Sequence, residues 1–454
     1  MFESVLIANR GEIAVRIART CRDLGIRVVA VYSTEDRDSP VVRMADQAIC
    51  IGPAAAADSY LNLPAILEAA RQSGAEAIHP GYGFLSEVPD FAESCTAAGH
   101  TFIGPPAAVI EQLGDKSAAR AAMAKAGLRM VAGSIEPVPD AEAAAKVAAD
   151  IGYPVIIKAV AGGGGRGMQA VHCPDELPST FASVKATAQS LFKDDRVYLE
   201  QYLPGARHVE VQVLCDSYGT GVHIGQRDCS VQRRRQKIIE ESPAPQLPAD
   251  LATRMGRAAL RGVLAEGYVG AGTVEFLVDA SGCFYFMEVN CRIQVEHPVT
   301  ELVYGIDLIR EQLRIAAGEP LGYTQADLVP RGVALECRLN AEDPARAFMP
   351  TPGVLTDCTL PAGAFVRVDT DKAAGDRISA AYDPLLAKIA VWAPDRAQAL
   401  VRMRRALAET RIAGAGVCTN RDLLNTVLHH PAFVAGNHDT SFLDDLVSTE
   451  HQRV

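Results

Sequence analysis

Five polar side chains alternate with apolar ones between residues 288 and 296. In an extended chain, residues two apart share a face, so one face of this segment carries Glu288, Asn290, Arg292, Gln294 and Glu296. That face offers carboxylates and an amide as metal ligands, and a guanidinium for an oxyanion. A fully extended segment would span roughly 26 Å, which is too long for one small site, so we expect a bend after Asn290. An exposed strand edge would alternate too, but the apolar run before it, 284–287, is typical of a buried strand.

A second carboxylate, Glu275, alternates with apolar neighbours in a strand-like segment that precedes the one with Glu288. Two adjacent strands would place these carboxylates side by side. At about 4 Å two like charges repel by about 4 kcal/mol at an effective dielectric near 20, so the pair needs a cation. Together with the amide of Asn290, these oxygens favour Mg²⁺ over zinc. The alternative is an exposed pair of carboxylates on a strand edge.

A glycine-rich stretch, 162–168, lies between two predicted strands and follows Lys158. Glycines let backbone N–H groups surround phosphate oxygens, so we predict a phosphate-binding loop that closes over a nucleotide. It is not a P-loop, which needs Gly-Lys-Ser/Thr at the start of a helix. A plain hairpin turn is the alternative, but four consecutive glycines are an entropically costly way to make one. Lys116 and Lys158 are candidates for charges on the same phosphates.

Three other segments are candidates for the same site. The basic run 232–237 is unusual in an acidic chain, and Lys237 is its best candidate for an anion contact. Residues 333–340 alternate again, and Arg338 could meet a developing oxyanion there. The loop 79–87 follows a strand, at the end where open parallel sheets bind ligands. His79, His208 and Cys229 are as easily explained by packing or a structural hydrogen bond.

Composition excludes several classes of protein. The chain has 454 residues, 48% of them apolar, and a net charge of −11, which argues against nucleic acid and anionic membranes as partners. Its eleven cysteines include no Cys-x-x-Cys pair, as expected for reduced thiols in the cytosol. The first dozen residues reach Arg10 too early for a signal peptide, and no run approaches the ~20 apolar residues that span a bilayer. We therefore predict a cytoplasmic protein.

The predicted elements form an α/β chain. Residues 4–8, 27–32, 75–78 and 101–103 read as strands separated by Ala-rich helices, which predicts an open parallel sheet. The first turn lacks Gly-x-Gly-x-x-Gly, so nicotinamide binding is not expected. A glycine-hinged segment at about 131–203 suits a mobile lid. Further strands are predicted at 208–215, 221–226, 272–278, 284–288, 333–340 and 364–368, and a helix at 395–409.

Taken together, these residues resemble the biotin carboxylase family of the ATP-grasp superfamily. The resemblance covers roughly residues 1–445, and the run Arg-Ile-Gln-Val-Glu-His-Pro-Val-Thr-Glu at 292–301 is scarcely expected elsewhere. Its other segments are 6–17, 79–87, Lys116, 162–168, 200–203, 207–213, 227–233, 336–344 and 382–384. Departures from the family pattern at Cys291, Gln201 and Arg235 remove no catalytic group.

The resemblance implies a fold and a set of ligands. The fold would be an N-terminal open parallel-sheet α/β domain at 1–114, an ATP-grasp domain with its lid at 115–330, and a C-terminal α+β domain at 331–446. The implied ATP contacts are Lys116, Lys158, Gly163, Gly164, Gly165, Gly167, Met168, Glu200, Gln201, Leu203, His208, Gln232, Glu275 and Glu288. The implied ligands of two Mg²⁺ (or Mn²⁺) ions are Glu275, Glu288 and Asn290.

The resemblance also implies roles in catalysis. Bicarbonate would be held by Lys237, Arg292, Gln294, Val295 and Glu296. Glu296 would be the general base, Arg338 would stabilise the biotin enolate, and Tyr82 would line the biotin side. The implied reaction is ATP- and bicarbonate-dependent carboxylation of biotin at N1′ through carboxyphosphate, the first half-reaction of an acyl-CoA carboxylase, with acetyl-CoA as the expected acceptor.

The implied partners are a biotin carboxyl carrier protein, carboxyltransferase subunits and a second copy of the chain in a homodimer. The sequence has no Met-Lys-Met, so biotin is expected on another polypeptide or on a region outside this sequence. The alternatives are a component of a pyruvate or propionyl-CoA type carboxylase, and another ATP-grasp carboxylate–amine ligase. An inactive ATP-binding regulator should have lost Glu296 or a metal carboxylate, and both are present.

Overall fold

A computed structural model describes residues 1–134, 136–161, 167–233 and 235–451. Gly163, Gly164 and Gly165 of the predicted phosphate loop lie outside the described residues. Within those ranges no helix is both long enough and apolar enough to cross a membrane. All eleven cysteines fall inside them and carry free thiols.

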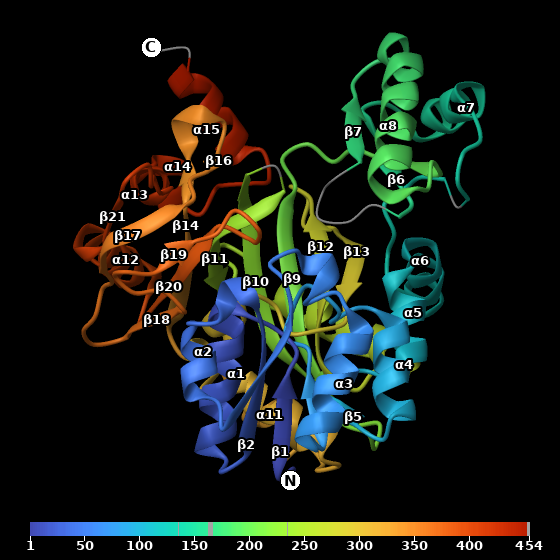
Figure 1. Cartoon of the computed structure of the whole chain (residues 1–454). Helices are drawn as coiled ribbons and strands as arrows, with labels where there is room; N and C mark the ends of the chain where they lie inside the picture. The colour runs from blue at the N-terminus through green and yellow to red at the C-terminus, as the bar shows by residue number, and fades with distance from the viewer. Residues whose placement is uncertain (135, 162–166, 234, 452–454) are drawn as a thin grey trace.

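The N-terminal part is the open parallel sheet that the sequence predicts (Figure 1). Its strand order is β3-β2-β1-β4-β5, and every neighbouring pair is parallel. The strands are β1 Ser4–Ile7, β2 Arg27–Ser33, β3 Gln47–Gly52, β4 Ala77–His79 and β5 Thr101–Phe102. The sequence analysis missed β3, a half-exposed edge strand whose apolar run is only four residues long, 48–51. The helices are α1 Gly11–Asp23, α2 Pro40–Met44, α3 Leu63–Ser73, α4 Pro89–Ala97 and α5 Ala107–Gly114.

The segment predicted as a lid forms a small layer with its own apolar core, seen at the upper right of Figure 1. Helices α7 (Ala141–Ile151) and α8 (Leu177–Phe192) pack on its sheet. This antiparallel sheet has the order β7-β6-β8, formed by β6 Val155–Ala159, β7 Met168–Val171 and β8 Val197–Gln201. Helix α6 (Lys116–Lys125) precedes this layer in the chain.

The largest sheet is antiparallel throughout and positions most of the polar residues identified above. Its order is β13-β12-β9-β10-β11-β14-β20-β18. The strands are β9 Arg207–Cys215, β10 Gly221–Arg233, β11 Gln236–Ser242, β12 Gly270–Val278, β13 Phe284–Asn290, β14 Val333–Asn340, β18 Val366–Thr370 and β20 Leu385–Ala393. The sequence analysis missed β11 and β20. Because β11 pairs with β14, this sheet runs unbroken past residue 330.

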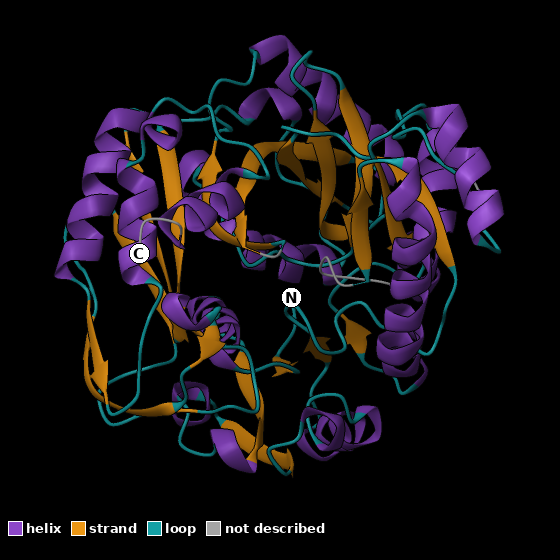
Figure 2. Cartoon of the chain, turned by 90° about the horizontal axis from the view of Figure 1, so that it is seen from above, coloured by secondary structure: helices purple, strands orange, loops and turns teal. Residues whose placement is uncertain are grey.

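Helices cover the sheets on the outside, as the view from above shows (Figure 2). The predicted helix at 395–409 is confirmed as α12 (Arg396–Glu409), and the Asp395 side chain caps it by accepting from the Gln398 N–H. The other helices are α9 Ala249–Ala265, α10 His297–Tyr304, α11 Leu308–Ala316, α13 Arg421–His429, α14 Pro431–Val434 and α15 Phe442–His451. The short strands are β15 Glu342–Asp343, β16 Met349–Pro350, β17 Gly353–Thr359, β19 Arg377–Ile378 and β21 Arg411–Gly414.

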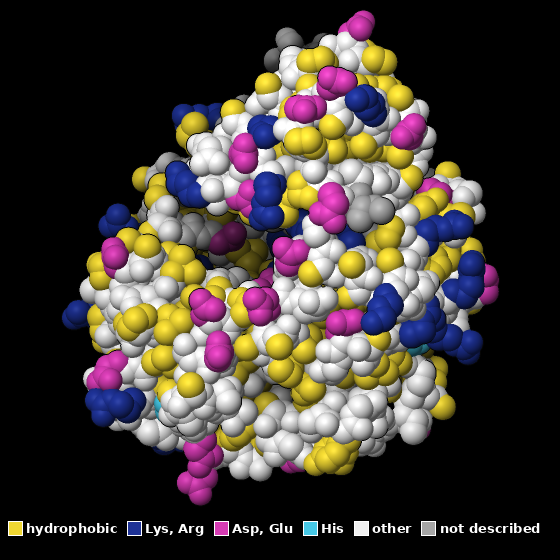
Figure 3. Space-filling model, turned by 90° about the vertical axis from the view of Figure 1, so that its right-hand side faces the viewer, with side chains coloured by type: hydrophobic (Ala, Val, Ile, Leu, Met, Phe, Trp, Pro, Cys, Tyr) yellow, Lys and Arg dark blue, Asp and Glu magenta, His cyan; other side chains and the backbone are white. Residues whose placement is uncertain are grey.

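Seen from the side, the surface is hollowed below the upper lobe, with acidic and basic side chains at its edge (Figure 3).

Candidate active site

A cluster of buried charges surrounds Lys237, on β11. Its ammonium lies 2.6 Å from Glu210 Oε2, 2.9 Å from Glu275 Oε1 and 2.6 Å from Glu296 Oε1. These carboxylates come from β9, β12 and the turn before α10, so three separate segments converge on one cation. Burial opposes the charged ammonium, but the three carboxylates hold the pKa of Lys237 well above its ordinary value.

Glu296 lies just after the predicted bend, which the structure confirms because β13 ends at Asn290. The carboxylate is fully buried and bridges two cations, Lys237 and Arg338, with Arg338 Nη2 at 2.9 Å from Oε2. Burial alone would raise the pKa of Glu296, but the two cations hold it well below the ordinary value. The carboxylate is therefore ionised at neutral pH and can accept a proton.

Arg338 projects from β14 and is held from its other side by Glu240, whose Oε1 accepts from Nε at 2.6 Å. Burial raises the pKa of Glu240 to about 7, against the opposing charge of Arg338. The guanidinium thus sits between two carboxylates, Glu240 and Glu296, which set the plane of its donors.

Glu275 and Glu288 face each other across β12 and β13, as predicted. Glu275 accepts from Asn290 Nδ2 at 2.9 Å, and its Oε2 lies 2.9 Å from His208 Nε2, whereas Glu288 lies 3.5 Å from Lys116. Although burial opposes ionisation, Lys237 and His208 hold the pKa of Glu275 well below its ordinary value. The chemistry of the two carboxylates suits Mg²⁺, whereas the amide oxygen of Asn290 accepts from Arg292 Nη2 and would have to turn to bind the same ion.

The predicted nucleotide contacts are split between the lid and the large sheet. Glu200, on β8, forms ion pairs with Lys158 and Arg120. Its neighbour Gln201 is exposed and Leu203 is half-buried. In the large sheet, Gln232 Nε2 lies 2.6 Å from His208 Nδ1. Glu200 and Lys158 are thus brought together, but within the described residues no hydrogen bond or ion pair links Gln201 or Leu203 to the charged cluster.

The glycine stretch is described only from Gly167 onward. Gly167 has φ +72°, and a Cβ there would lie 2.9 Å from the Phe192 ring, so a side chain at this position would be strained. Met168 follows as the first residue of β7 and contacts Arg235 of the basic run. The lid therefore touches the β10–β11 end of the large sheet.

Arg292 lies where the chain bends and is held by three groups. Its Nε is 2.7 Å from Glu87 Oε2, at the end of the loop 79–87, and its Nη1 is 2.8 Å from Gln294 Oε1. Its Nη2 donates to Asn290 Oδ1 at 3.1 Å. In the same loop, the Tyr82 hydroxyl donates to Glu12 on α1. The loop 79–87 begins at the end of β4, as predicted, and it contacts the bend through Glu87.

The sequence analysis missed several buried charges that hold these residues. Glu210 and Glu240 are fully buried partners of Lys237 and Arg338, and Arg227 Nε contacts Glu210 at 2.6 Å. The alternation of His208, Glu210 and Gln212 was a usable signal for the first of them. Lys388 is a further buried charge that was missed, and its signal was that it interrupts an otherwise apolar strand.

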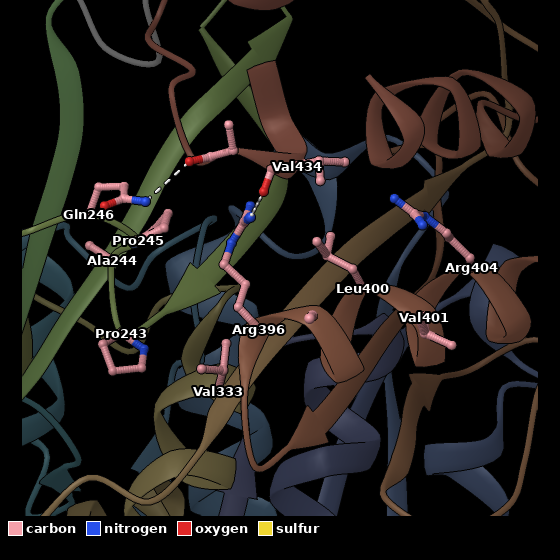
Figure 4. A pocket seen from close by; sticks show the side chains of 12 residues that line it. Pro243, Ala244, Pro245, Gln246, Val333, Arg396, Leu400, Val401, Arg404 and Val434 are labelled. Carbon is pink, nitrogen blue, oxygen red and sulfur yellow. Dashed lines mark hydrogen bonds between the residues drawn. The ribbon is translucent and has the colours of Figure 1, made fainter. Parts of the chain in front are cut away.

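A pocket of about 620 Å³ lies elsewhere, between the turn 243–246, α12 and α14 (Figure 4). It contains none of the predicted site residues. Its guanidinium Arg396 is already neutralised by Glu241 at 2.7 Å. The charged cluster, rather than this cavity, is the candidate active site.

Family models of known proteins match nearly the whole chain. Models described as biotin carboxylase, N-terminal domain and biotin carboxylase C-terminal domain match residues 1–110 and 336–445. A model of the carbamoyl-phosphate synthase L chain, ATP binding domain matches residues 115–324. The biotin carboxylase of a Nostoc species is 50% identical over 98% of this chain and 99% of its own length.

The chain belongs to the biotin carboxylase family. It is thus an ATP-dependent ligase with the fold that the resemblance implied. One of the pyruvate carboxylase subunits of Methanothermobacter thermautotrophicus is 48% identical over 98% of this chain and 90% of its own. The biotin carboxylase domain dimer of the Hydrogenobacter thermophilus 2-oxoglutarate carboxylase, in complex with MgADP, ADP and bicarbonate, matches with a TM-score of 0.95 and 44% identity over 98% of each chain.

Proposed function

We propose that the charged cluster around Lys237 carboxylates biotin at N1′, with ATP and bicarbonate as co-substrates and carboxyphosphate as the intermediate. The observation that carries this proposal is the placement of Glu296 between Lys237 and Arg338. A base and two anion-binding cations then occupy one buried site, as the activation and transfer of bicarbonate require.

ATP would lie between the lid and the large sheet. Lys116, Lys158 and His208 would hold it, together with the glycine stretch. Glu275, Glu288 and Asn290 would hold Mg²⁺, whose charge neutralises the phosphates. Lys116 and Lys237 now lie against those two carboxylates, so the carboxylates would exchange these partners for the metal. The related 2-oxoglutarate carboxylase domain with its MgADP supports this assignment.

Bicarbonate would lie on Lys237, Arg292, Gln294 and the backbone of Val295, next to Glu296. The cations that keep Glu296 ionised also weaken it as a base. An anion bound to Lys237 draws that ammonium away from Glu296 and thereby raises the basicity of the carboxylate. Binding and deprotonation of bicarbonate are thus coupled, and the oxyanion formed attacks the γ-phosphorus of ATP.

Biotin would enter on the side of Tyr82 and Arg338. Carboxyphosphate hydrolyses readily, so a lid that excludes water protects it. Carboxyphosphate breaks down to CO2 and phosphate, and this phosphate takes the N1′ proton. Arg338 stabilises the enolate oxygen of biotin, and N1′ then attacks CO2 to form the N–C bond of carboxybiotin. Glu240 and Glu296 hold Arg338 in place before the negative charge develops on the enolate oxygen.

For the whole enzyme, we propose a homodimer that carboxylates biotin on a separate carrier protein and passes it to carboxyltransferase subunits. The dimeric 2-oxoglutarate carboxylase domain supports the first part. Acetyl-CoA is the proposed final acceptor. The 48% identity to a pyruvate carboxylase component makes pyruvate the alternative acceptor. Reconstitution with each type of transferase and its carrier tests which acceptor is carboxylated.

The test of the proposed reaction is ADP release measured with and without bicarbonate and free biotin. We expect cleavage of ATP to depend on bicarbonate and to rise when biotin is added. Equal ADP release in bicarbonate-depleted buffer would contradict the proposal. Stimulation by D-alanine in place of biotin would instead favour a carboxylate–amine ligase.

A further inference from the structure

Lys388 is a buried cation to which the proposed mechanism gives no role. It lies on β20, and its side chain is 0% exposed. An ammonium removed from water costs several kcal/mol unless charges and hydrogen bonds compensate it. Every neighbouring residue on β20 is apolar, so a leucine or methionine would suit the strand better. The position of this lysine therefore calls for a specific explanation.

The strand register places Lys388 beside the proposed site. It pairs with Arg338 on β14 and with Asp369 on β18. Residues directly opposite each other on antiparallel strands share a face, so Lys388 and Arg338 project to the same side of the sheet. That side is covered by α10, whose first residue follows Glu296.

The ammonium contacts three segments that are far apart in the sequence. It donates to the Val295 carbonyl at 2.9 Å and lies 3.0 Å from Glu12 Oε1 on α1. The carboxylate of Asp369 is at 3.9 Å. One side chain thus connects helix α1, the bend before α10 and the C-terminal strands.

The contact with Val295 bears on the general base. Residues 291–296 belong to no helix or strand, so the segment is held by individual hydrogen bonds. Glu87 accepts from the Cys291 N–H at 2.9 Å, and His297 Nδ1 lies 2.7 Å from the Gln294 carbonyl. The bond from Lys388 fixes the next peptide plane, which joins Val295 to Glu296. The direction in which the Glu296 side chain leaves the backbone depends on that plane.

The contact with Glu12 bears on the biotin side. The same Oε1 that faces Lys388 also accepts from the Tyr82 hydroxyl. Tyr82 is otherwise a residue of an irregular loop, so this hydrogen bond fixes its ring relative to α1. Lys388 is therefore linked to Glu296 through the Val295 carbonyl and to Tyr82 through the Glu12 carboxylate.

We propose that Lys388 is a positioning residue for both halves of the reaction: it orients the Val295–Glu296 peptide for bicarbonate and, through Glu12, holds Tyr82 for biotin. This inference rests on the proposed function of Glu296 and Tyr82. Lys388 itself touches no substrate, since a backbone carbonyl and two carboxylates take up its contacts.

Lys388→Met tests the first half, and Arg367→Met is the matched control. Arg367 is also a cation of this network, bonded to Glu301 at 2.6 Å and Asp369 at 2.7 Å, but it does not touch residues 291–296. We expect Lys388→Met to lower kcat/KM for bicarbonate about ten- to a hundredfold while KM for ATP changes less than about twofold. Arg367→Met should leave KM for bicarbonate unchanged. Lys388→Gln keeps a neutral donor for the carbonyl and should recover part of the loss.

Hydrogen exchange of peptides covering residues 291–300 gives a readout that needs no turnover. We expect faster exchange in Lys388→Met than in Arg367→Met or the wild type. Equal exchange and equal bicarbonate kinetics in the two methionine variants would overturn the proposal. A wild-type chain without bicarbonate-dependent ATP cleavage would count against the proposed function alone, because exchange would still decide the role of Lys388.

Glu12→Gln tests the second half and serves also if Lys388→Met does not fold. It removes the charge between Lys388 and Tyr82 but leaves the bond to Val295. We expect a several-fold higher KM for free biotin with an unchanged KM for bicarbonate. An unchanged KM for biotin would remove Tyr82 from the proposal, and a higher KM for bicarbonate would show that the two contacts are not separable.

Discussion

Glu296 and Arg338 form one ion pair, yet the proposed mechanism uses them in different steps. Glu296 acts before carboxyphosphate forms, and Arg338 acts after it. Their 2.9 Å contact means that each variant also disturbs the other residue, so a simple loss of activity would not separate their roles. The ratio of two products does separate them, because only the later step makes carboxybiotin.

We expect Glu296→Ala to abolish bicarbonate-dependent ATP cleavage with or without biotin, because bicarbonate keeps its proton. Arg338→Gln should instead retain part of the ATP cleavage, since carboxyphosphate still forms and hydrolyses. Loss of one donor to a developing oxyanion costs roughly 3–4 kcal/mol, so carboxybiotin formation should fall about a hundred- to thousandfold. The measurement is carboxybiotin formed per ADP released. An unchanged ratio in Arg338→Gln would place Arg338 in the earlier step.

At the residue scale, the sequence predicted the side chains of the candidate site better than the buried charges that hold them. The alternation from Glu288 to Glu296 and the motif around it pointed to the side chains that converge. Lys388 could be noticed locally as a charge in an apolar strand, but its partners and those of Glu240 come from strand register, which joins β11, β14 and β20 across about 150 residues of chain. No local pattern records such a pairing.

At the scale of elements, the pairing of β12 with β13 decides where a metal can bind. The prediction that Glu275 and Glu288 lie side by side is confirmed by their register. It succeeded because two adjacent strands in the sequence most often pair with each other. Strand β11 was missed because its first two residues belong to the basic run 232–237, and β20 because Lys388 interrupts its apolar run.

Replacing Glu288 with Lys tests the predicted metal site. The variant removes a carboxylate ligand and places a cation there, opposite Glu275 and near Lys116. We expect γ-phosphoryl transfer to fall by orders of magnitude, because the phosphates lose the neutralising metal. Glu288→Gln, which adds no positive charge, should show a smaller loss. ADP release over a Mg²⁺ titration measures both variants, and near-normal turnover of Glu288→Lys would exclude Glu288 as a ligand.

At the scale of the whole molecule, the N-terminal sheet and the large sheet share one apolar core. Residues such as Leu6 and Val31 lie in the same buried cluster as Val211 and Val274. The sequence predicted the parallel sheet, the lid layer and the β-rich remainder, but not this shared core. Periodicity shows which face of an element is buried, whereas the partner it is buried against depends on the three-dimensional arrangement. A change within the N-terminal sheet should therefore affect the stability of more than that sheet.

His79, at the end of β4, should make the free energy of unfolding of the chain depend on pH. The ring is fully buried, and its Nδ1 accepts from the Gly81 N–H at 3.1 Å, so the folded chain holds it neutral. Burial, assisted by the charge of Arg16, lowers the pKa of His79 to about 3. In the unfolded chain the ring takes up a proton near pH 6.5. Its contribution to stability is therefore fully present above pH 6.5 and is lost as the pH falls from there towards 3.

We expect His79→Asn to be less stable than the wild type at pH 8, because it leaves space in a packed region. The difference should shrink by about 2 kcal/mol between pH 8 and pH 5, since only the wild type loses stability through this ring. The other buried histidines are present in both chains, so their contributions to the pH dependence cancel in the difference. Urea unfolding of both chains at several pH values gives the difference. A difference that widens at low pH would mean that the folded chain holds His79 protonated, and that the neutral ring described here is wrong.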